Sequence, residues 1–198
     1  NRYCPDILKS FVVPTGSLLV MLPIMLVVTA PLGYYIGTYV AEAVIWIYET
    51  IGFLGVSILC ALLPLMVMTG MHTMMTPYWT SAFASLGYDP FFLPAMILSN
   101  MNQFAATLAV SLKAKTKKVK STAMSCAVTA IVGGVTEPAM FGITFKYKKP
   151  LYAAMIGNAA GGLIAGLLKV ACYAFPGSGG MFAVVTFAGP GNNLIFFL

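Results

Sequence analysis

Two ionisable side chains stand out because each lies within a long apolar stretch of sequence. Glu137 is the only acidic residue between Asp89 and the end of the chain. A charged side chain in hydrocarbon costs at least about 2.5 kcal/mol, so a carboxyl group there is a functional candidate. His72, the only histidine, occupies a similar apolar run just after Gly70. The alternatives are structural, since Glu137 could pair with a lysine or cap a half-helix, and a lone histidine is more often a hydrogen-bonded core residue.

Three uncharged polar side chains add hydrogen-bonding groups to the apolar segments, namely Thr136, Asn100 and Gln103. Amides and carboxylates are groups that hold sugar hydroxyls, although each of these residues taken singly could equally bridge two helices. Trp46 and Trp79 could stack on a sugar ring, but anchoring at the lipid interface is the favoured interpretation. The four cysteines are isolated and show no CxxC spacing. Neither a disulfide framework nor a metal site is therefore predicted.

The composition indicates that membrane-spanning helices position these groups. Sixty per cent of the residues are hydrophobic and 8% are charged, whereas a soluble domain carries about 25% charged residues. The uncharged runs cover residues 10–41, 50–88, 90–112, 150–168 and 170–198. Each can cross the bilayer, which takes roughly 20 helical residues, and none alternates like an outer-membrane strand. The predicted fold class is an all-α membrane protein with polytopic transmembrane helices and re-entrant hairpins.

The stretch 121–145 is the most informative, because it is apolar except for Glu137 and has lysines on both flanks. Eight of the eleven basic residues lie in the two flanking clusters, a pattern typical of cytoplasmic loops rather than of a nucleic-acid-binding surface. A single span would place one cluster outside, whereas a hairpin keeps both inside. Gly133 and Gly134 could form its tip, and Pro138 prevents a regular helix from continuing. Non-helical backbone at membrane depth is tolerated only in protein or beside a watery cavity, so we predict a re-entrant hairpin that lines a site.

Three local patterns predict how other segments begin, break and pack. Gly87-Tyr-Asp-Pro90 predicts a turn before a helix, because Asp favours caps and Pro the first helical position. The run 50–88 is too long for one span and is expected to divide near Gly70. Gly157-x-x-x-Gly161 and Gly162-x-x-x-Gly166 provide two faces that let other helices approach closely.

The stretch Gly134-Val-Thr-Glu-Pro-Ala-Met-Phe-Gly142, followed by Lys148-Lys149-Pro150 and a glycine-rich helix, carries a family resemblance. It resembles the membrane-embedded enzyme IIC of the bacterial phosphoenolpyruvate:sugar phosphotransferase system. The similarity is to the glucose superfamily, in the branch for β-glucosides, sucrose and trehalose. Further similarity lies around Thr69 to His72, in Gly87 to Pro90, in the helix from Asn100 to Lys115, and in Gly189 to Asn192.

The resemblance implies a function and a set of site residues. Such proteins bind a sugar in the membrane and present its hydroxyl to a phosphocysteine on enzyme IIB. By position, Glu137 and His72 match the family's sugar-contacting glutamate and histidine, and both are given catalytic roles. The sugar site that the resemblance implies consists of Glu137, His72, Thr136, Asn100 and Gln103. Thr73 departs from the Trp that many members have after the histidine, which leaves part of the sugar contact open.

The resemblance also predicts the setting of the chain. Residues 1–198 are expected to form a single membrane-embedded domain, the C-terminal, substrate-binding part of an enzyme IIC permease in the bacterial inner membrane. The expected partners are a sugar of the β-glucoside, sucrose or trehalose type, an enzyme IIB domain, membrane lipid and a second copy. The homodimer contact is expected in N-terminal helices that the chain lacks. No cofactor and no nucleic acid are expected.

The phosphoryl donor is expected on another chain or an absent part, since Cys4 in Arg-Tyr-Cys-Pro-Asp is unlike the enzyme IIB cysteine loop. The predicted function is group translocation, with the chain as the membrane component of a protein-phosphocysteine sugar phosphotransferase, inactive alone. The alternative is a proton-coupled secondary sugar transporter in which Glu137 or His72 titrates, since a broken helix at the midplane also suits that class. A third hypothesis is a fragment that serves only within an assembly.

Overall fold

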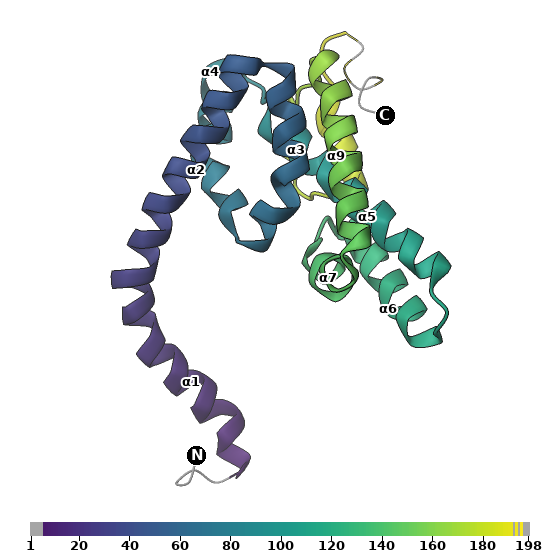
Figure 1. Ribbon diagram of the computed structural model, residues 1–198. Coiled ribbons are helices and arrows are strands. Elements are labelled where there is room, and N and C mark those ends of the chain that lie inside the picture. Colours follow the sequence, from purple (N-terminus) through teal and green to yellow (C-terminus); the bar gives the residue numbers. More distant parts are fainter. Residues whose placement is uncertain (1–5, 192, 194, 196–198) are drawn as a thin grey trace. The chain divides into compact units, whose positions relative to one another are not determined.

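The computed structural model describes residues 6–191, 193 and 195 (Figure 1). It divides into two compact units, Asn1–Ala41 and Glu42–Leu198. All regular elements in the described residues are helical, and the one pairing of strand type there is an isolated antiparallel bridge between Asp89 and Cys172. The all-α prediction is therefore confirmed, while the single-domain boundary stays a prediction.

The first unit consists of a long apolar helix with one irregular turn. Helix α1 (Asp6–Ile24) leads through a π-helical turn, η1 (Met25–Thr29), into α2 (Ala30–Ile51), whose second half belongs to the second unit. The π turn follows Pro23, which has no backbone N–H to donate to the preceding turn.

The second unit contains the segments that carry the predicted site. Its remaining elements are α3 (Phe53–Met68), the 3-10 helix η2 (Met71–Met75), α4 (Thr76–Leu86), α5 (Phe92–Lys113), α6 (Lys117–Val128), the π turn η3 (Thr129–Gly133), α7 (Glu137–Ala139), the π turn η4 (Met140–Thr144), α8 (Phe145–Tyr147), α9 (Lys149–Leu167) and the 3-10 helix η5 (Met181–Phe187). Helices α3, α5 and α9 pack against one another and form the centre of the unit, with α3 and α9 side by side in Figure 1.

Two helices in the described part of the chain are long and apolar enough to cross a bilayer. They cover Thr15–Ile36 and Lys149–Leu167, and Phe53–Met68 is a shorter apolar helix. A helix of this length matches the roughly 30 Å hydrocarbon core. The number and direction of the membrane passes stay a prediction.

The predicted break near Gly70 is confirmed. Helix α3 ends at Met68, and Gly70 adopts a left-handed conformation with φ of +74° before η2 begins. Only glycine adopts this conformation at little cost. The break places His72 in the first turn of a short 3-10 helix rather than within a regular span.

The turn before α5 is built on Asp89, whose side chain is fully buried. Its Oδ1 accepts hydrogen bonds from the backbone N–H groups of Phe91 (2.9 Å) and Phe92 (3.1 Å), and Oδ2 accepts one from Leu93 (2.7 Å). The predicted Asp cap is confirmed. The predicted place of Pro90 at the first helical position was wrong, because α5 begins at Phe92. Two backbone hydrogen bonds of 2.8 Å between Asp89 and Cys172 hold the residue before the proline outside the helix.

The glycines of α9 confirm the predicted close packing. A Cβ on Gly162 would lie 2.7 Å from Cys60 Sγ and 3.0 Å from the backbone of Ser57 in α3. One on Gly161 would lie 2.9 Å from Leu98 in α5. The two small-residue faces therefore contact two different helices.

We expect Gly162→Leu to lower the yield and thermal stability of the folded protein, because a leucine there would push α3 away from α9. Forcing extra carbon atoms into a packed contact costs about 1–3 kcal/mol or more. Ala160→Leu is the matched control, since Ala160 lies on the exposed side of the same helix. Yield by size-exclusion chromatography and the unfolding temperature in detergent measure the effect. Equal behaviour of the two variants would show that the Gly162 face tolerates a side chain.

Candidate functional site

Residues 117–147 form two helical arms that fold back on each other. The first arm is α6 with η3, and the second comprises α7, η4 and α8. Cys126 and Gly142, each eight residues from Gly134, lie opposite each other, since a Cβ on Gly142 would be 3.8 Å from Cys126 Sγ. The arms are thus antiparallel, with the turn at the predicted tip. Entry of both arms from one membrane face stays a prediction.

The second arm starts directly after the turn because its sequence favours a helix start. Pro138 lies in the first turn of α7, where its missing N–H group would have had no helical partner. The backbone carbonyl of Thr136 accepts a hydrogen bond of 2.8 Å from the Met140 N–H group. Pro138 therefore lies in the first turn of the second arm.

The tip of the hairpin contacts the loop at residues 178–180. Gly134 has a φ of +69°, and a Cβ there would overlap the backbone of Gly179 and Gly180. A Cβ on Gly180 would lie 2.5 Å from the carbonyl oxygen of Ile131. Ser178 Oγ donates a hydrogen bond of 2.9 Å to the carbonyl oxygen of Gly133. Backbone against backbone contact of this kind requires glycine on both sides.

Two predicted site residues of α5 form hydrogen bonds to the segments on either side of this contact. Asn100 bonds to the loop at residues 178–180, and Gln103 bonds to the second arm. Asn100 is buried, and its Nδ2 donates a hydrogen bond of 3.1 Å to the carbonyl oxygen of Gly179. Gln103 Oε1 accepts one of 3.2 Å from Thr144 Oγ1 in the second arm, while Gln103 Nε2 is buried without a partner. Both residues thus bridge segments, and Gln103 keeps one donor free.

Thr136 and Glu137 sit at the tip with different exposure. Thr136 is buried, whereas Glu137 is exposed as the first residue of α7. No hydrogen bond or ion pair holds the Glu137 carboxylate among the described residues. Neither structural alternative, lysine pairing or side-chain capping, is observed there. The carboxylate remains available as an acceptor.

His72 lies in η2, which packs against α3 and α4. The side chain is partly buried, and its Nδ1 atom is buried with no hydrogen-bond partner in the described part of the chain. The hydrogen-bonded core histidine is therefore not what the structure shows. No hydrogen bond or ion pair joins His72 to Glu137 within the described ranges.

Sequence reasoning missed a buried polar stripe along α5. Thr107 and Ser111 follow Gln103 at intervals of four residues, and both are fully buried. Thr107 Oγ1 has no partner, whereas Ser111 donates a hydrogen bond of 3.0 Å to the Lys120 carbonyl. Polar residues at every third or fourth position mark one helix face, which was the available signal.

A second buried polar pair links α5 to α9. Asn158 Nδ2 donates a hydrogen bond of 3.0 Å to Ser99 Oγ, and Asn158 Oδ1 has no partner. An unpaired buried polar atom costs about 1–3 kcal/mol. Gln103 Nε2 and Thr107 Oγ1 of α5 and Asn158 Oδ1 of α9 are therefore groups that a polar ligand or water could satisfy.

No predicted site residue lines either of two well-formed pockets in the second unit. The larger has a volume of about 1000 Å³ and is lined in part by Tyr48, Glu49, Tyr78 and Lys169. The smaller, of about 630 Å³, lies at the ends of α5 and α9. No residue of the hairpin tip belongs to the walls of either pocket.

The family described as "Phosphotransferase system, EIIC" matches residues 3–159. The chain belongs to this EIIC family. The resemblance inferred from the Thr-Glu-Pro motif is therefore confirmed. EIIC is an integral membrane component, and the apolar helices of this chain fit a location in the membrane.

Curated EIIC relatives match nearly the whole chain. A β-glucoside-specific EIIBCA component of Bacillus subtilis is 40% identical over 190 residues, covering 96% of this chain and 31% of the relative. An arbutin-, cellobiose- and salicin-specific EIIBC component of Escherichia coli is 34% identical over 96% of this chain and 39% of its own length. A sucrose-specific EIIBC component of B. subtilis is 32% identical over 100% of this chain and 42% of its own length. The chain thus spans less than half the length of these relatives. No solved structure matches it.

Proposed function

We propose that this EIIC chain binds a sugar within the membrane and presents it for phosphorylation by a phosphorylated enzyme IIB. The relatives' names place B and C components in one polypeptide and describe specificity for sugars. The observation that carries the proposal is the unpaired, exposed carboxylate of Glu137 at the tip of an otherwise apolar hairpin. An acceptor without an internal partner in such a segment is suited to sugar hydroxyls.

The proposed substrate class is a β-glucoside, with sucrose as the next candidate. The relative at 40% identity is named for β-glucosides, and the one at 34% for arbutin, cellobiose and salicin. Sucrose-specific relatives match at 32% and 30%. Thr73, which lies exposed in η2 beside His72, is the residue we expect to influence the choice of sugar.

The proposed mechanism gives separate roles to Glu137 in α7 and His72 in η2. Glu137 accepts hydrogen bonds from sugar hydroxyls, and His72 orients the hydroxyl that becomes phosphorylated. That hydroxyl oxygen attacks the phosphorus of the enzyme IIB phosphocysteine, an O–P bond forms, the P–S bond breaks and the thiolate leaves. The hydroxyl proton is lost to the imidazole of His72 in the same step. A bound sugar is what would connect the hairpin tip with η2.

We expect His72→Gln to impair sugar phosphorylation at least as much as sugar binding. Transfer needs the hydroxyl aligned with the phosphorus, and small misplacements cost about a hundredfold in rate. Sugar affinity and phosphoenolpyruvate-dependent phosphorylation are measured in the complete transporter, with Ala84→Gln on the exposed side of α4 as control. Normal phosphorylation in His72→Gln would remove His72 from the mechanism.

The re-entrant topology predicts that residues 118 and 148 are accessible from the same membrane face, because the two arms enter and leave together. Cysteines replacing Lys118 and Lys148 in the complete protein, on a background without native cysteines, should react with an impermeant reagent from the cytoplasm. A cysteine replacing Lys169, just beyond the other end of the candidate span Lys149–Leu167, is the control for the opposite face. Labelling of positions 118 and 148 from opposite faces would make this stretch an ordinary span.

Dependence of uptake on phosphoenolpyruvate tests the function itself. In membrane vesicles that hold the complete transporter and the soluble phosphotransferase components, the sugar should accumulate as its phosphate. Collapse of the proton gradient should leave this uptake largely intact. Accumulation of free sugar, abolished by a protonophore, would instead favour the proton-coupled secondary transporter.

A further inference from the structure

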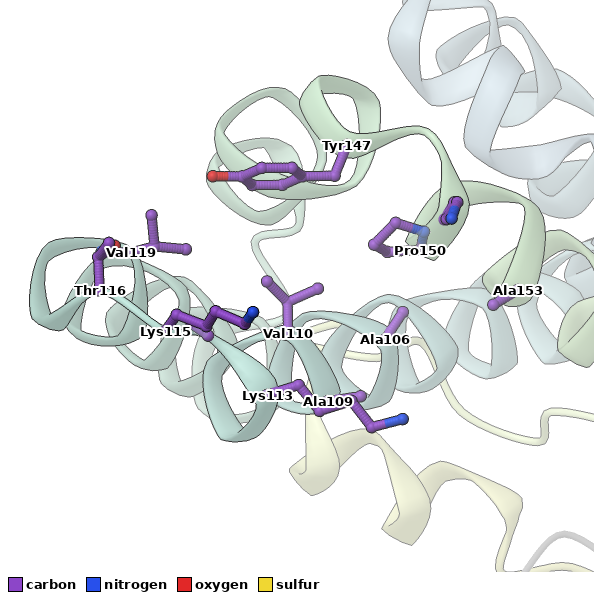
Figure 2. Close-up of a pocket in the computed structure, with 12 residues that line it drawn as sticks. Ala106, Ala109, Val110, Lys113, Lys115, Thr116, Val119, Tyr147, Pro150 and Ala153 are labelled. Atoms are coloured by element: carbon purple, nitrogen blue, oxygen red, sulfur yellow. The ribbon is translucent and has the colours of Figure 1, made fainter.

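The smaller pocket lies where α5 ends and α9 begins (Figure 2). Its volume is about 630 Å³, within the range of small-molecule sites. Figure 2 shows Tyr147 and Pro150 on one side and Val110 with Ala106 on the other. Apolar side chains of four helices, α5, α6, α8 and α9, and of the loop between α5 and α6 therefore form its floor and walls.

The rim of this pocket is positively charged. Lys113, Lys115 and Lys149 line it, and no acidic residue does. All three lysines are exposed, and none has an ion-pair partner among the described residues. An apolar floor with an unneutralised basic rim complements a molecule that is apolar at one end and anionic at the other.

The pocket lies at the end of a candidate membrane span, where molecules with an apolar part and an anionic part are abundant. Lys149 is the first residue of the candidate membrane span Lys149–Leu167, and Lys113 is the last residue of α5. In a membrane component, lysines at the end of a span lie near the phosphate groups of the lipid. The apolar lining residues Ala106 and Ala153 lie one to two turns further along α5 and α9, where the acyl chains begin.

We propose that this pocket binds an anionic phospholipid, with the phosphate between the three lysines and an acyl chain along the apolar floor. A free phosphate ion would leave the apolar floor unused. An acidic protein surface would pair with the exposed lysines but would likewise leave the apolar floor unused. Only a lipid among these three ligands uses both the basic rim and the apolar floor of the pocket.

The test is a titration of the purified full-length protein in neutral detergent with phosphatidylglycerol, followed by native mass spectrometry. The triple variant Lys113→Gln, Lys115→Gln, Lys149→Gln should lower phosphatidylglycerol affinity by roughly a hundredfold, since each lysine near an anionic lipid contributes about a factor of five. The matched control carries the same loss of charge in α6, as Lys117→Gln, Lys118→Gln, Lys120→Gln, outside the pocket. It should lower the affinity much less than the pocket variant does, because these lysines do not line the pocket.

A second pair of variants leaves all lysines in place. Ala109→Phe fills the pocket and should also weaken phosphatidylglycerol binding, whereas Ala105→Phe, exposed one turn earlier on α5 and outside the lining, should not. Equal binding of phosphatidylcholine, or equal loss in both triple variants, would overturn the lipid site. Full competition by inorganic phosphate would show an ion site instead. Loss of enzyme IIB binding with unchanged lipid affinity would show a protein-docking surface, and that result would also contradict the proposal.

Discussion

Replacing Glu137 with glutamine should weaken sugar binding by roughly one to two orders of magnitude, because hydrogen bonds to a charged acceptor contribute about 1.5 to 3 kcal/mol. The substitution keeps the size of the side chain and removes its charge. Since Glu137 is exposed and has no partner among the described residues, folding should be unaffected. Calorimetric titration of the complete transporter with a β-glucoside measures the affinity, and phosphoenolpyruvate-dependent phosphorylation should fall with it.

Glu49→Gln is the most informative control for this experiment. Glu49 is also exposed, but it lines the pocket of about 1000 Å³ together with Tyr48 and Tyr78. Tyrosines and a carboxylate could themselves hold a sugar. Normal affinity in Glu49→Gln with loss in Glu137→Gln places the site at the hairpin tip. The reverse outcome would move the sugar to that pocket and contradict the assignment of Glu137.

Gly134→Ala should abolish transport and strongly lower the amount of folded protein. A left-handed backbone conformation costs a residue with a Cβ about 1–2 kcal/mol, and here the Cβ would also overlap the backbone of Gly179 and Gly180. The tip could accept alanine only by separating from that loop, which would break the hydrogen bond from Ser178 to Gly133.

Gly133→Ala supplies a matched control on the neighbouring residue. The nearest atom to a Cβ there is Val135 Cγ2 at 3.7 Å, an ordinary contact, and Gly133 has no left-handed backbone. It should keep near-normal folding and uptake, measured as detergent-stable protein and as sugar phosphate formed in vesicles. Similar behaviour of Gly133→Ala and Gly134→Ala would show that the tip does not depend on contact with the 178–180 loop.

Features governed by local rules were predictable from the sequence. The tip at Gly133 and Gly134 followed from two glycines between basic clusters, and the cap by Asp89 from its place before an apolar run. The close packing of Gly162 followed from the small-residue spacing. In each case the residue types and their spacing carried the signal, because backbone sterics and hydrogen-bonding preferences act locally, although the partners of Gly134 and Gly162 lie far away in the sequence.

Features that depend on distant partners were not predictable. Asn100 was recognised as a polar group, but its acceptor, the carbonyl of Gly179, lies 79 residues away. Gln103 pairs with Thr144 at a separation of 41 residues. Pro90 likewise lies outside the helix, although proline favours the first helical position, because the isolated bridge to Cys172 holds the preceding residue, Asp89. Contacts of this range are set by the packing of whole helices rather than by any motif.

A structure of the complete transporter with a bound β-glucoside tests the proposed site most directly. The proposal predicts a sugar hydroxyl within about 2.5–3.0 Å of the Glu137 carboxylate, and the imidazole of His72 next to the hydroxyl that becomes phosphorylated. A sugar bound between Tyr48 and Tyr78, or anywhere that leaves Glu137 without a contact to it, would contradict the proposal.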